Sequence, residues 1–167
     1  MDQLRIYRVE DKYIRFLHGA DSRVQSNKGA RRPYVGIVLV VGSYRYFVPM
    51  ESPKENHKNL KPGIHIMLLE GGKYGLLGFN NMIPVPACAL IEVQFSDLED
   101  VKYRNLLERQ AQFINRHKAD VFNHASKTYF RATTKTTDNF FKRICCDFKK
   151  LEYVCERYDP NYHPQDK

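Results

Sequence analysis

The stretch YVGIVLVVGSYRYFVPMESPK, residues 34–54, decides the fold of this chain. It begins with the continuous apolar, β-branched run YVGIVLVV (34–41) and continues, after Gly42 and Ser43, with YRYFVP (44–49). Two strand-like segments separated by two residues, one of them glycine, are typical of a β-hairpin. The two segments are therefore predicted to pair as antiparallel strands.

Four more segments ahead of residue 96 have the composition of strands, and they are LRIYRV (4–9), IHIMLLE (64–70), YGLLGF (74–79) and ALIEVQF (89–95). The second and third flank Gly71-Gly72-Lys73, which predicts a second hairpin. Prolines interrupt MIPVPA (82–87), the segment before the last of these strands. The first part of the chain is thus predicted to contain about six strands.

Beyond residue 96 the apolar residues recur at helical spacing instead. One predicted helix has a face made of Tyr103, Leu106, Leu107, Gln110, Phe113, Ile114 and His117. A second has a face made of Phe141, Ile144, Cys145, Phe148, Leu151, Cys155 and Tyr158. Candidate first residues are Ser96 with Glu99 or Asp97 with Asp100 for the first helix, and Thr137 or Asp138 for the second. The segment 124–137 between them predicts a short helix and an exposed connection.

Strands followed by helices indicate an α+β domain, in which helices pack on one face or end of an antiparallel sheet. A length of 167 residues suits one domain with its own core, so residues 1–167 are predicted to form a single domain. No GxGxxG or GxxxxGK[ST] turn joins a strand to a helix. We therefore expect no nucleotide cofactor.

The charge of the chain favours a polyanionic partner. Lysine and arginine total 27 against 19 acids, which gives a net charge of +8 and a pI near 9.3. Nucleic acid is the leading candidate and an acidic membrane surface the weaker one. The longest apolar run, 34–42, is far shorter than the roughly 20 residues of a membrane span. MDQLRIYRVED (1–11) contains no signal-peptide-like apolar stretch, so a cytoplasmic protein without a membrane partner is expected.

The cysteines and histidines do not predict a metal site. Cys88, Cys145, Cys146 and Cys155 lack CxxC spacing, and two of them fall on the apolar face of a predicted helix. The six histidines are scattered singly along the chain. We expect reduced cysteines that pack in the interior and no metal cofactor.

The end of the first hairpin has two interpretations. Ser52 can cap a helix whose first turn contains Pro53, which needs no functional explanation and is favoured by spacing alone. Alternatively Ser52, Lys54 and His57 bind a phosphate, because free N–H groups at a strand-to-helix junction attract anions. A covalent serine nucleophile has the least support, since no GxSxG segment is present.

A second basic segment, NKGARRPY (27–34), precedes the central strand, where Arg31 and Arg32 would emerge at the rim of the sheet. A solvated loop explains this segment equally well. Several tyrosines also neighbour cations, as Tyr7 does between Arg5 and Arg8. Such interleaving suits unstacked bases and a phosphate track, although ordinary strand composition accounts for most of these tyrosines.

RNA can be cleaved without a metal ion, because the ribose 2′-hydroxyl can attack its own phosphate. The site must then remove one proton, donate another to the leaving 5′-oxygen and hold the developing negative charge with cations. The acids of this chain include no clear pair for two-metal catalysis. Residues alone therefore indicate a phosphate site and an RNA partner.

Five segments give the chain a family resemblance, and they are KYIRFL (12–17), RRPYVGIVL (31–39), YFVPMESPK (46–54), YGLLGFNNMIPVP (74–86) and YRNLLERQAQFI (103–114). Their order and spacing resemble the ToxN/AbiQ family of type III toxin–antitoxin endoribonucleases, and most closely its CptN-type toxins. The resemblance covers nearly the whole chain. It implies a twisted antiparallel sheet of the MazF/Kid-like toxin kind with flanking helices.

The resemblance also implies an activity and partners. It implies metal-independent cleavage of target mRNA, usually at adenine-rich sequences, to 2′,3′-cyclic phosphate and 5′-hydroxyl ends. It implies an antitoxin that is a small pseudoknotted RNA, cut from a repetitive transcript by the toxin and held across the active site. Toxin and RNA would form a closed assembly, a heterotetramer or a heterohexamer. In several relatives such a system aborts phage infection.

Carried over position by position, the resemblance implies catalytic roles for Tyr13, Arg32, Ser52 and Lys54. The candidates for RNA binding are Lys28, Arg31, Glu51, His57, Lys58 and Lys127. Arg32 stands where family members often have lysine, and since arginine does not readily release a proton, it is predicted to stabilise charge. Lys54, Tyr13 and His57 are the candidates for proton transfer.

Glu51 stands where family members often have threonine. It could tune Lys54, accept a proton, or simply face outward at a strand end. Two rival functions fit the same residues as the endoribonuclease. A non-catalytic RNA-binding regulator would share the basic charge and the aromatic side chains, and a metal-dependent nuclease would be stopped by EDTA.

Overall fold

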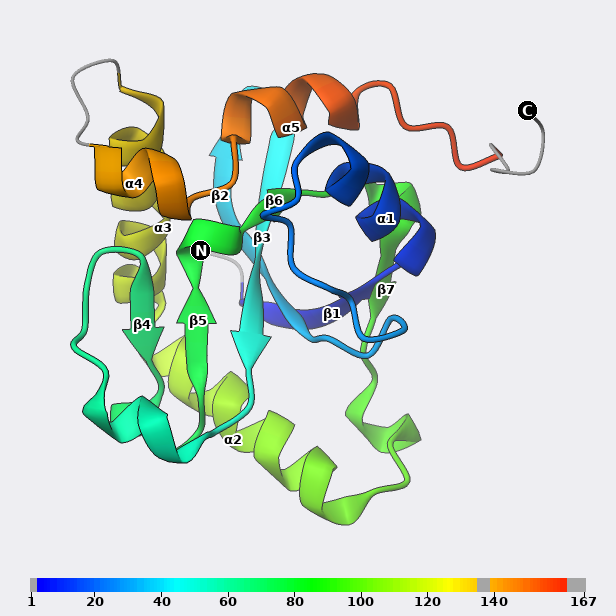
Figure 1. Cartoon of the computed structure of the whole chain (residues 1–167). Coiled ribbons are helices and arrows are strands. Elements are labelled where there is room, and N and C mark those ends of the chain that lie inside the picture. The colour runs from blue at the N-terminus through cyan, green and yellow to red at the C-terminus, as the bar shows by residue number, and fades with distance from the viewer. Residues whose placement is uncertain (1–2, 135–138, 162–167) are drawn as a thin grey trace.

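The computed structural model describes residues 3–134 and 139–161, which form an antiparallel sheet with helices (Figure 1). The described strands are β1 (Arg5–Val9), β2 (Tyr34–Val41), β3 (Tyr44–Glu51), β4 (Ile66–Leu68), β5 (Leu76–Gly78), β6 (Ile83–Pro84) and β7 (Leu90–Glu92). Their order is β4-β5-β3-β2-β1-β7, and β6 also pairs with β3. Every pairing is antiparallel, so the predicted α+β class with an antiparallel sheet is confirmed.

The first predicted hairpin is the β2–β3 pair. Tyr34 lies opposite Pro49 and Val41 opposite Tyr44, with an irregularity between Gly36 and Leu39. The main-chain N–H of Met50 donates to the carbonyl oxygen of Pro33, at an N···O distance of 3.0 Å. The pairing therefore extends one residue beyond the start of β2.

The second predicted hairpin, β4–β5, is also present and pairs Met67 with Leu77. Its turn contains the short 3₁₀ helix η2 (Glu70–Gly72). The sequence did not predict β6, because its two residues lie among the prolines of 82–87. The remaining 3₁₀ segments are η1 (Glu55–Asn59), η3 (Phe79–Asn81), η4 (Ala87–Ala89) and η5 (Phe95–Asp97).

Helix α2 (Val101–Arg116) confirms the first predicted helix, and its cap is Asp100, whose carboxylate accepts from Tyr103 N at 3.1 Å. Helix α1 (Asp11–Ala20) was missed by the strand-based prediction for this part of the chain. It buries Tyr13, Ile14 and Leu17. That three- and four-residue spacing was the available signal.

Two other helix predictions were wrong in extent. The short helix predicted within 124–137 is part of the longer α3 (Lys118–Thr133), whose buried residues are Val121, Ala125 and Thr128. The single helix expected over 141–158 is two, α4 (Asn139–Ile144) and α5 (Phe148–Cys155). The break follows from Cys146, whose N–H donates to the carbonyl oxygen of Asn80 (2.9 Å). The proposed caps Thr137 and Asp138 lie outside the described residues.

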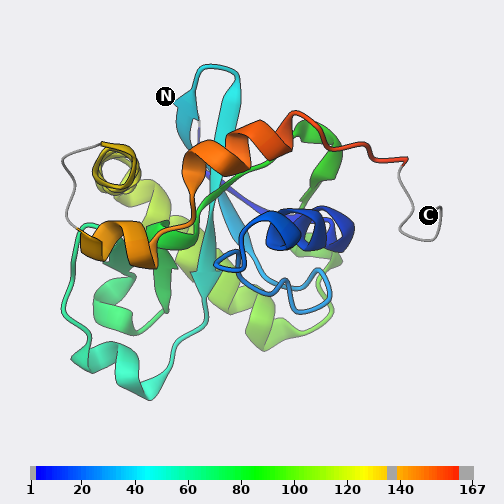
Figure 2. The ribbon, with the colours of Figure 1, turned by 45° about the horizontal axis from the view of Figure 1, so that its top comes forward.

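The helices pack on both sides of the sheet. In Figure 1, α2 and α3 lie behind it and α1 lies in front. Helices α1 and α5 lie side by side in both ribbon views (Figure 2), with the rings of Tyr13 and Tyr158 4.8 Å apart. None of the described helices is long and apolar enough to cross a bilayer.

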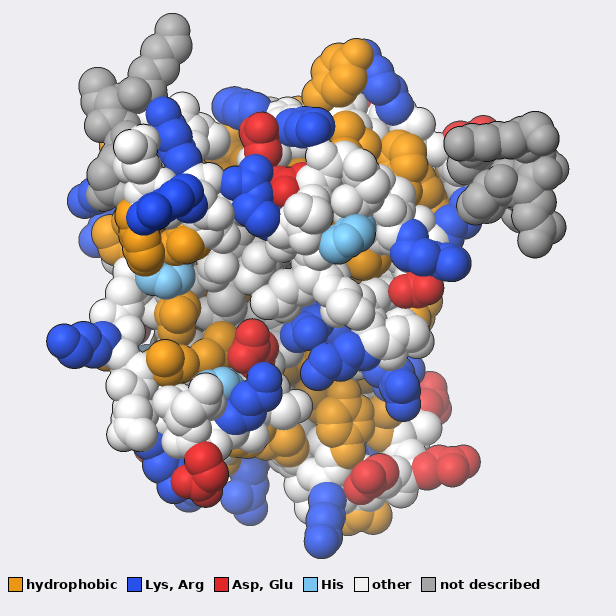
Figure 3. Space-filling view, viewed as in Figure 1, with side chains coloured by type: hydrophobic (Ala, Val, Ile, Leu, Met, Phe, Trp, Pro, Cys, Tyr) orange, Lys and Arg blue, Asp and Glu red, His pale blue; other side chains and the backbone are white. Residues whose placement is uncertain are grey.

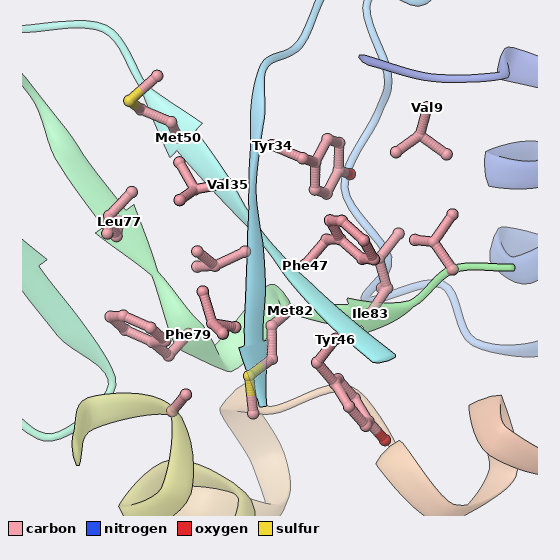
Figure 4. Close-up of a cluster of buried hydrophobic side chains, with 14 of the residues drawn as sticks. Val9, Tyr34, Val35, Tyr46, Phe47, Met50, Leu77, Phe79, Met82 and Ile83 are labelled. Carbon is pink, nitrogen blue, oxygen red and sulfur yellow. The ribbon is translucent and has the colours of Figure 1, made fainter. Parts of the chain in front are cut away.

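Buried side chains of β2, β3, β5 and β6 form the centre of the core (Figure 4). Tyr46 points toward α5, where its hydroxyl donates to Oε2 of buried Glu152 at 2.6 Å. Cys145 and Cys146 are buried free thiols, and burial raises the pKa of each to about 12. The packing role predicted for the cysteines is confirmed for these two, whereas Cys88 is exposed.

The loop between α1 and β2 is fixed to the α4–α5 junction by Asp21. Its buried carboxylate accepts from Arg23 Nε (2.9 Å) through Oδ1 and from Asp147 N (2.7 Å) through Oδ2. Burial alone would raise the pKa of Asp21, but these hydrogen bonds outweigh it and lower the pKa below its ordinary value of 3.8. The carboxylate therefore stabilises the fold above about pH 3.8, and this contribution is lost as the pH falls through the folded-state pKa.

We predict that Asp21→Asn lowers the free energy of unfolding at pH 7 by about 1–3 kcal/mol, because the amide NH₂ would meet a donor where an acceptor is needed. Urea denaturation at several pH values would measure this. The difference from the unsubstituted protein should shrink as the pH falls below 3.8. The control is Asp11→Asn, which removes the exposed ion pair with Arg15 (3.2 Å) and should cost less than about 1 kcal/mol. Equal costs for the two variants would contradict the prediction.

Candidate active site

The β2–β3 pairing brings two basic segments to one end of the sheet. Arg32 precedes β2, and Ser52 follows β3. In the register that pairs Tyr34 with Pro49, continued past the bond between Met50 and Pro33, Arg32 falls opposite Glu51. Residues about twenty positions apart in the sequence are therefore neighbours at the same end of two adjacent strands.

A tight loop holds the two arginines in place. The main-chain N–H groups of Arg31 and Arg32 both donate to the carbonyl oxygen of Asn27, at 3.1 and 3.2 Å. The buried Asn27 side chain donates to the carbonyl oxygen of Val9 at the end of β1 (2.7 Å). Between them, residues 28–30 all have positive φ, which reverses the chain. The loop is thus anchored to the sheet and built in a conformation that costs free energy at its non-glycine positions.

The arginine side chains leave their outer nitrogen atoms available. Arg32 Nε donates to the carbonyl oxygen of Ser26 (2.8 Å), and Arg31 Nε donates to that of Lys28 (3.0 Å). Neither guanidinium forms an ion pair with an acid in the described part of the chain. Burial raises the pKa of the Tyr34 hydroxyl, and the nearby charge of Arg32 opposes that rise. Arg32 therefore lies just before the start of β2, without an acidic partner in the described part of the chain.

Ser52 does not cap a helix in this structure. The helix that follows is the short 3₁₀ segment η1, and its N-terminal cap position is Lys54. Ser52 is exposed, and within residues 3–134 and 139–161 its hydroxyl has no hydrogen-bond partner. The capping interpretation is wrong, so the hydroxyl remains available to a ligand.

A carboxylate, an ammonium and an imidazole meet directly after β3. Glu51 Oε2 lies 4.0 Å from Lys54 Nζ and 3.5 Å from His57 Nε2. Lys54 is largely exposed, Glu51 is partly buried and His57 is buried. Glu51 therefore faces its basic neighbours instead of pointing outward alone.

Strand β5 supports the same segment from the other side. Glu51 pairs with Leu76 across the β3–β5 ladder. Gly75 has φ +99°, and a Cβ at this position would lie 1.9 Å from the carbonyl oxygen of Glu51 and 3.3 Å from Pro53 N. Only glycine leaves room for the chain to turn here. Gly75 falls within the predicted strand 74–79, but in the structure it precedes β5 (Leu76–Gly78).

The surface around these residues is basic. Figure 3 shows lysine and arginine side chains gathered over the loop that precedes β2 and over the segment that follows β3, with a few acids between them. The described residues contain no group of three or more His, Cys, Asp or Glu side chains suited to a metal ion. A cavity of about 610 Å³ lies elsewhere, against α2 and η5, where Gln3, Phe95 and Glu108 help to line it.

Two of the predicted site residues are in the interior. Tyr13 is fully buried in α1, and its hydroxyl donates to the carbonyl oxygen of Pro84 (2.5 Å). Burial raises the pKa of this hydroxyl. His57 is only 2% exposed. These positions correct the expectation that Tyr13 or His57 touches RNA directly, because neither ring reaches the surface.

The other predicted RNA-binding residues are exposed but not all close together. Lys28 and Arg31 lie in the loop before β2, and Lys58 lies on η1 beside Glu55 (3.9 Å). Lys127 is on α3, which packs against β2, β4 and α4. The structure thus brings the cations of two segments to the end of the hairpin and places Lys127 on a separate element.

We predict that Gly75→Ala disturbs the segment after β3, because the new methyl group would overlap the carbonyl oxygen of Glu51. The free energy of unfolding should fall by at least about 1–3 kcal/mol. The amide NMR signals of residues 51–54 should also shift. Gly78→Ala, at the far end of β5, is the matched control, since its nearest neighbouring atom would be 3.6 Å from the new Cβ. Unchanged signals and stability in Gly75→Ala would refute the proposed close approach.

Comparisons with known proteins identify the family. A profile of the toxin ToxN of type III toxin–antitoxin systems matches residues 5–156. The endoribonuclease ToxN of Bacillus thuringiensis subsp. kurstaki is 34% identical over 94% of this chain and 85% of its own length. The endoribonuclease AbiQ of Lactococcus lactis subsp. lactis is 31% identical over 93% of this chain and 89% of its own.

A solved structure agrees with this assignment. It comes from work on a bacterial type III system in which a non-coding RNA pseudoknot selectively inhibits the toxin, and it superposes with a TM-score of 0.85 at 30% identity. The match covers 96% of this chain and all of that chain. The sheet and the helices of this chain thus have the same arrangement as in that solved structure. The chain belongs to the ToxN family of type III toxin–antitoxin toxins and, by homology, is an endoribonuclease.

Proposed function

We propose that this toxin cleaves target mRNA, with sequence preference and without a metal ion, at the surface formed by Arg32, Ser52 and Lys54. The observation that carries the proposal is the pairing of β2 with β3, which brings the free Ser52 hydroxyl and two cations to one end of the hairpin. Two positive groups and a hydroxyl donor match the needs of a phosphate that gains negative charge. Family membership supplies the RNA substrate class.

In the proposed reaction the ribose 2′-oxygen attacks the adjacent phosphorus atom and the bond from phosphorus to the 5′-oxygen breaks. The 2′-hydroxyl loses a proton to a base, and the departing 5′-oxygen receives a proton from an acid. The products are a 2′,3′-cyclic phosphate and a 5′-hydroxyl. No oxidant, water molecule or metal is consumed in this step.

Each side chain of the site has a proposed role that follows from its chemistry. Ser52 donates to a non-bridging phosphate oxygen, and Arg32 stabilises the developing charge, since a guanidinium keeps its proton. Lys54 Nζ and Glu51 Oε2 lie 4.0 Å apart, so a proton donor and a proton acceptor are close to each other. We assign proton donation to Lys54 and proton acceptance to Glu51. The nearby exposed cations Lys28, Arg31 and Lys58 hold the RNA backbone on either side.

The inhibitor proposed for this toxin is a small pseudoknotted RNA that the toxin itself cuts from a longer transcript. In the solved type III system described above, a non-coding RNA pseudoknot inhibits the toxin, and the basic face of this chain suits a folded polyanion. Closed assembly as a heterotetramer or heterohexamer, cytoplasmic location, a single domain over 1–167 and CptN-type membership are parts of the same proposal. A role in abortive phage infection is supported by the similarity to AbiQ, a lactococcal anti-phage endoribonuclease.

Ser52→Ala is predicted to lower the rate of cleavage by about 10²–10³-fold, the usual loss when one transition-state donor is removed. Lys54→Ala should lose about 10²–10⁴-fold, because it removes an acid as well as a charge. The assay maps new 5′-hydroxyl ends in total bacterial RNA and then follows a labelled oligoribonucleotide that contains a mapped site. Binding of that oligoribonucleotide should persist in Ser52→Ala, and EDTA should not change the rate.

Ser43→Ala is the matched control, because Ser43 is an exposed serine at the opposite end of the same hairpin. It should cleave at the unsubstituted rate. Full cleavage by Ser52→Ala would contradict the proposed site. Binding without cleavage by the unsubstituted protein would favour an RNA-binding regulator, and loss of cleavage in EDTA would favour a metal-dependent nuclease.

A further inference from the structure

His57 is a buried histidine that the proposed reaction does not use. It lies in η1 and is 2% exposed. Its ring Nδ1 atom accepts a hydrogen bond from the main-chain N–H of Lys54 (3.3 Å). The main-chain N–H of His57 donates to the carbonyl oxygen of Lys54 (3.0 Å). Both main-chain polar groups of Lys54 are therefore held by one residue.

The first of these contacts indicates the tautomer of the neutral ring. An Nδ1 atom that accepts a hydrogen bond carries no proton, so in the neutral imidazole the proton is on Nε2. Nε2 lies 3.5 Å from Oε2 of Glu51. The ring thus presents a lone pair to the main-chain N–H of Lys54 and an N–H toward the carboxylate of Glu51, so it contacts both residues that are assigned to proton transfer.

The turn of the second hairpin packs against His57 through Gly72. Gly72 is buried and has φ +96°. A Cβ on Gly72 would lie 3.2 Å from Cβ of His57 and 3.3 Å from its carbonyl oxygen. The close approach of Gly72 therefore limits where the His57 ring can lie, and it links β4–β5 to the segment after β3.

We propose that His57 is a positioning residue, which lies beside Glu51 and fixes Lys54 through its main chain, without touching RNA. The inference rests on the proposed roles of Lys54 and Glu51 in cleavage. It replaces the expectation that His57 binds RNA. Since small displacements of a reacting group are costly, loss of the anchor should lower kcat and leave KM nearly unchanged.

Two substitutions separate the contacts of the ring. In His57→Asn the side-chain oxygen occupies the place of Nδ1 and can still accept from Lys54 N–H. In His57→Gln the amide reaches the place of Nε2, but no acceptor remains for Lys54. We expect His57→Asn to keep kcat within about 3-fold, and His57→Gln and His57→Ala to lose about 10–100-fold. The assay is cleavage of the mapped oligoribonucleotide, with thermal unfolding as a check on folding and Asn59→Ala as an exposed control in η1.

A double-substitution cycle tests whether His57 acts through Lys54. In a Lys54→Ala background, His57→Gln should cause no further loss of kcat, because the group it positions is already absent. A further loss equal to that seen with Lys54 present would overturn the proposal, as would a raised KM with constant kcat or equal kcat values for His57→Asn and His57→Gln. If Lys54→Ala itself retains full activity, the proposed site fails instead, which distinguishes the two failures. Gly72→Ala offers a second route, since it pushes on His57 without removing the ring, and it should lower kcat only when Lys54 is present.

Discussion

The antiparallel pairing of β2 with β3 determines which polar side chains of this protein can act together. The register that sets Tyr34 opposite Pro49 places the residue before β2 beside the residues after β3. Both strands are largely buried, and consecutive residues of β3 such as Phe47 and Val48 are buried on opposite faces of the sheet, so a slip by one residue would exchange the side chains that pack on the two faces. The same apolar packing that stabilises the sheet therefore also aligns Arg32 with Ser52.

Polar contacts then refine this alignment. Asn27 holds the arginine loop to β1, and Asp21 fixes the start of the same loop to the α4–α5 junction. On the other side, Gly75 admits the carbonyl oxygen of Glu51 against β5. These contacts use buried or main-chain groups, while the outer guanidinium nitrogens and the Ser52 hydroxyl remain exposed. The groups that hold these segments in place are thus different from the groups that can bind phosphate.

Much of the fold could be predicted because its signals are local. The β2–β3 hairpin follows from Gly42-Ser43 between two apolar runs, and α2 follows from its spacing and Asp100. Helix α1 was missed because Lys12 and Arg15 interrupt the apolar pattern, although both lie on its more exposed side. The break between α4 and α5 has one local signal, Asp147, whose carboxylate caps α5 by accepting from the N–H of Lys150, but the break does not follow from that residue alone. It depends on hydrogen bonds to Asn80 and Asp21, which lie more than sixty residues away.

The candidate site could be predicted where it depends on the hairpin, but not where it depends on tertiary packing. Arg32 and Ser52 could be placed together as soon as the hairpin was recognised, because pairing alone brings them to one end. The burial of Tyr13 depends on contacts with β6 and Tyr158, and that of His57 depends on Gly72 in the next hairpin. Tertiary packing of this kind cannot be derived from residue types along one segment, so side chains with plausible chemistry were assigned to RNA although they lie inside.

The most direct measurement is a crystal structure of the protein with an oligoribonucleotide that carries a 2′-O-methyl group at the scissile nucleotide, which prevents attack. Our account predicts the scissile phosphate within hydrogen-bond distance of the Ser52 hydroxyl, with the charged groups of Arg32 and Lys54 on its oxygens. A scissile phosphate bound along α3 near Lys127, with the end of the β2–β3 hairpin empty, would contradict the account.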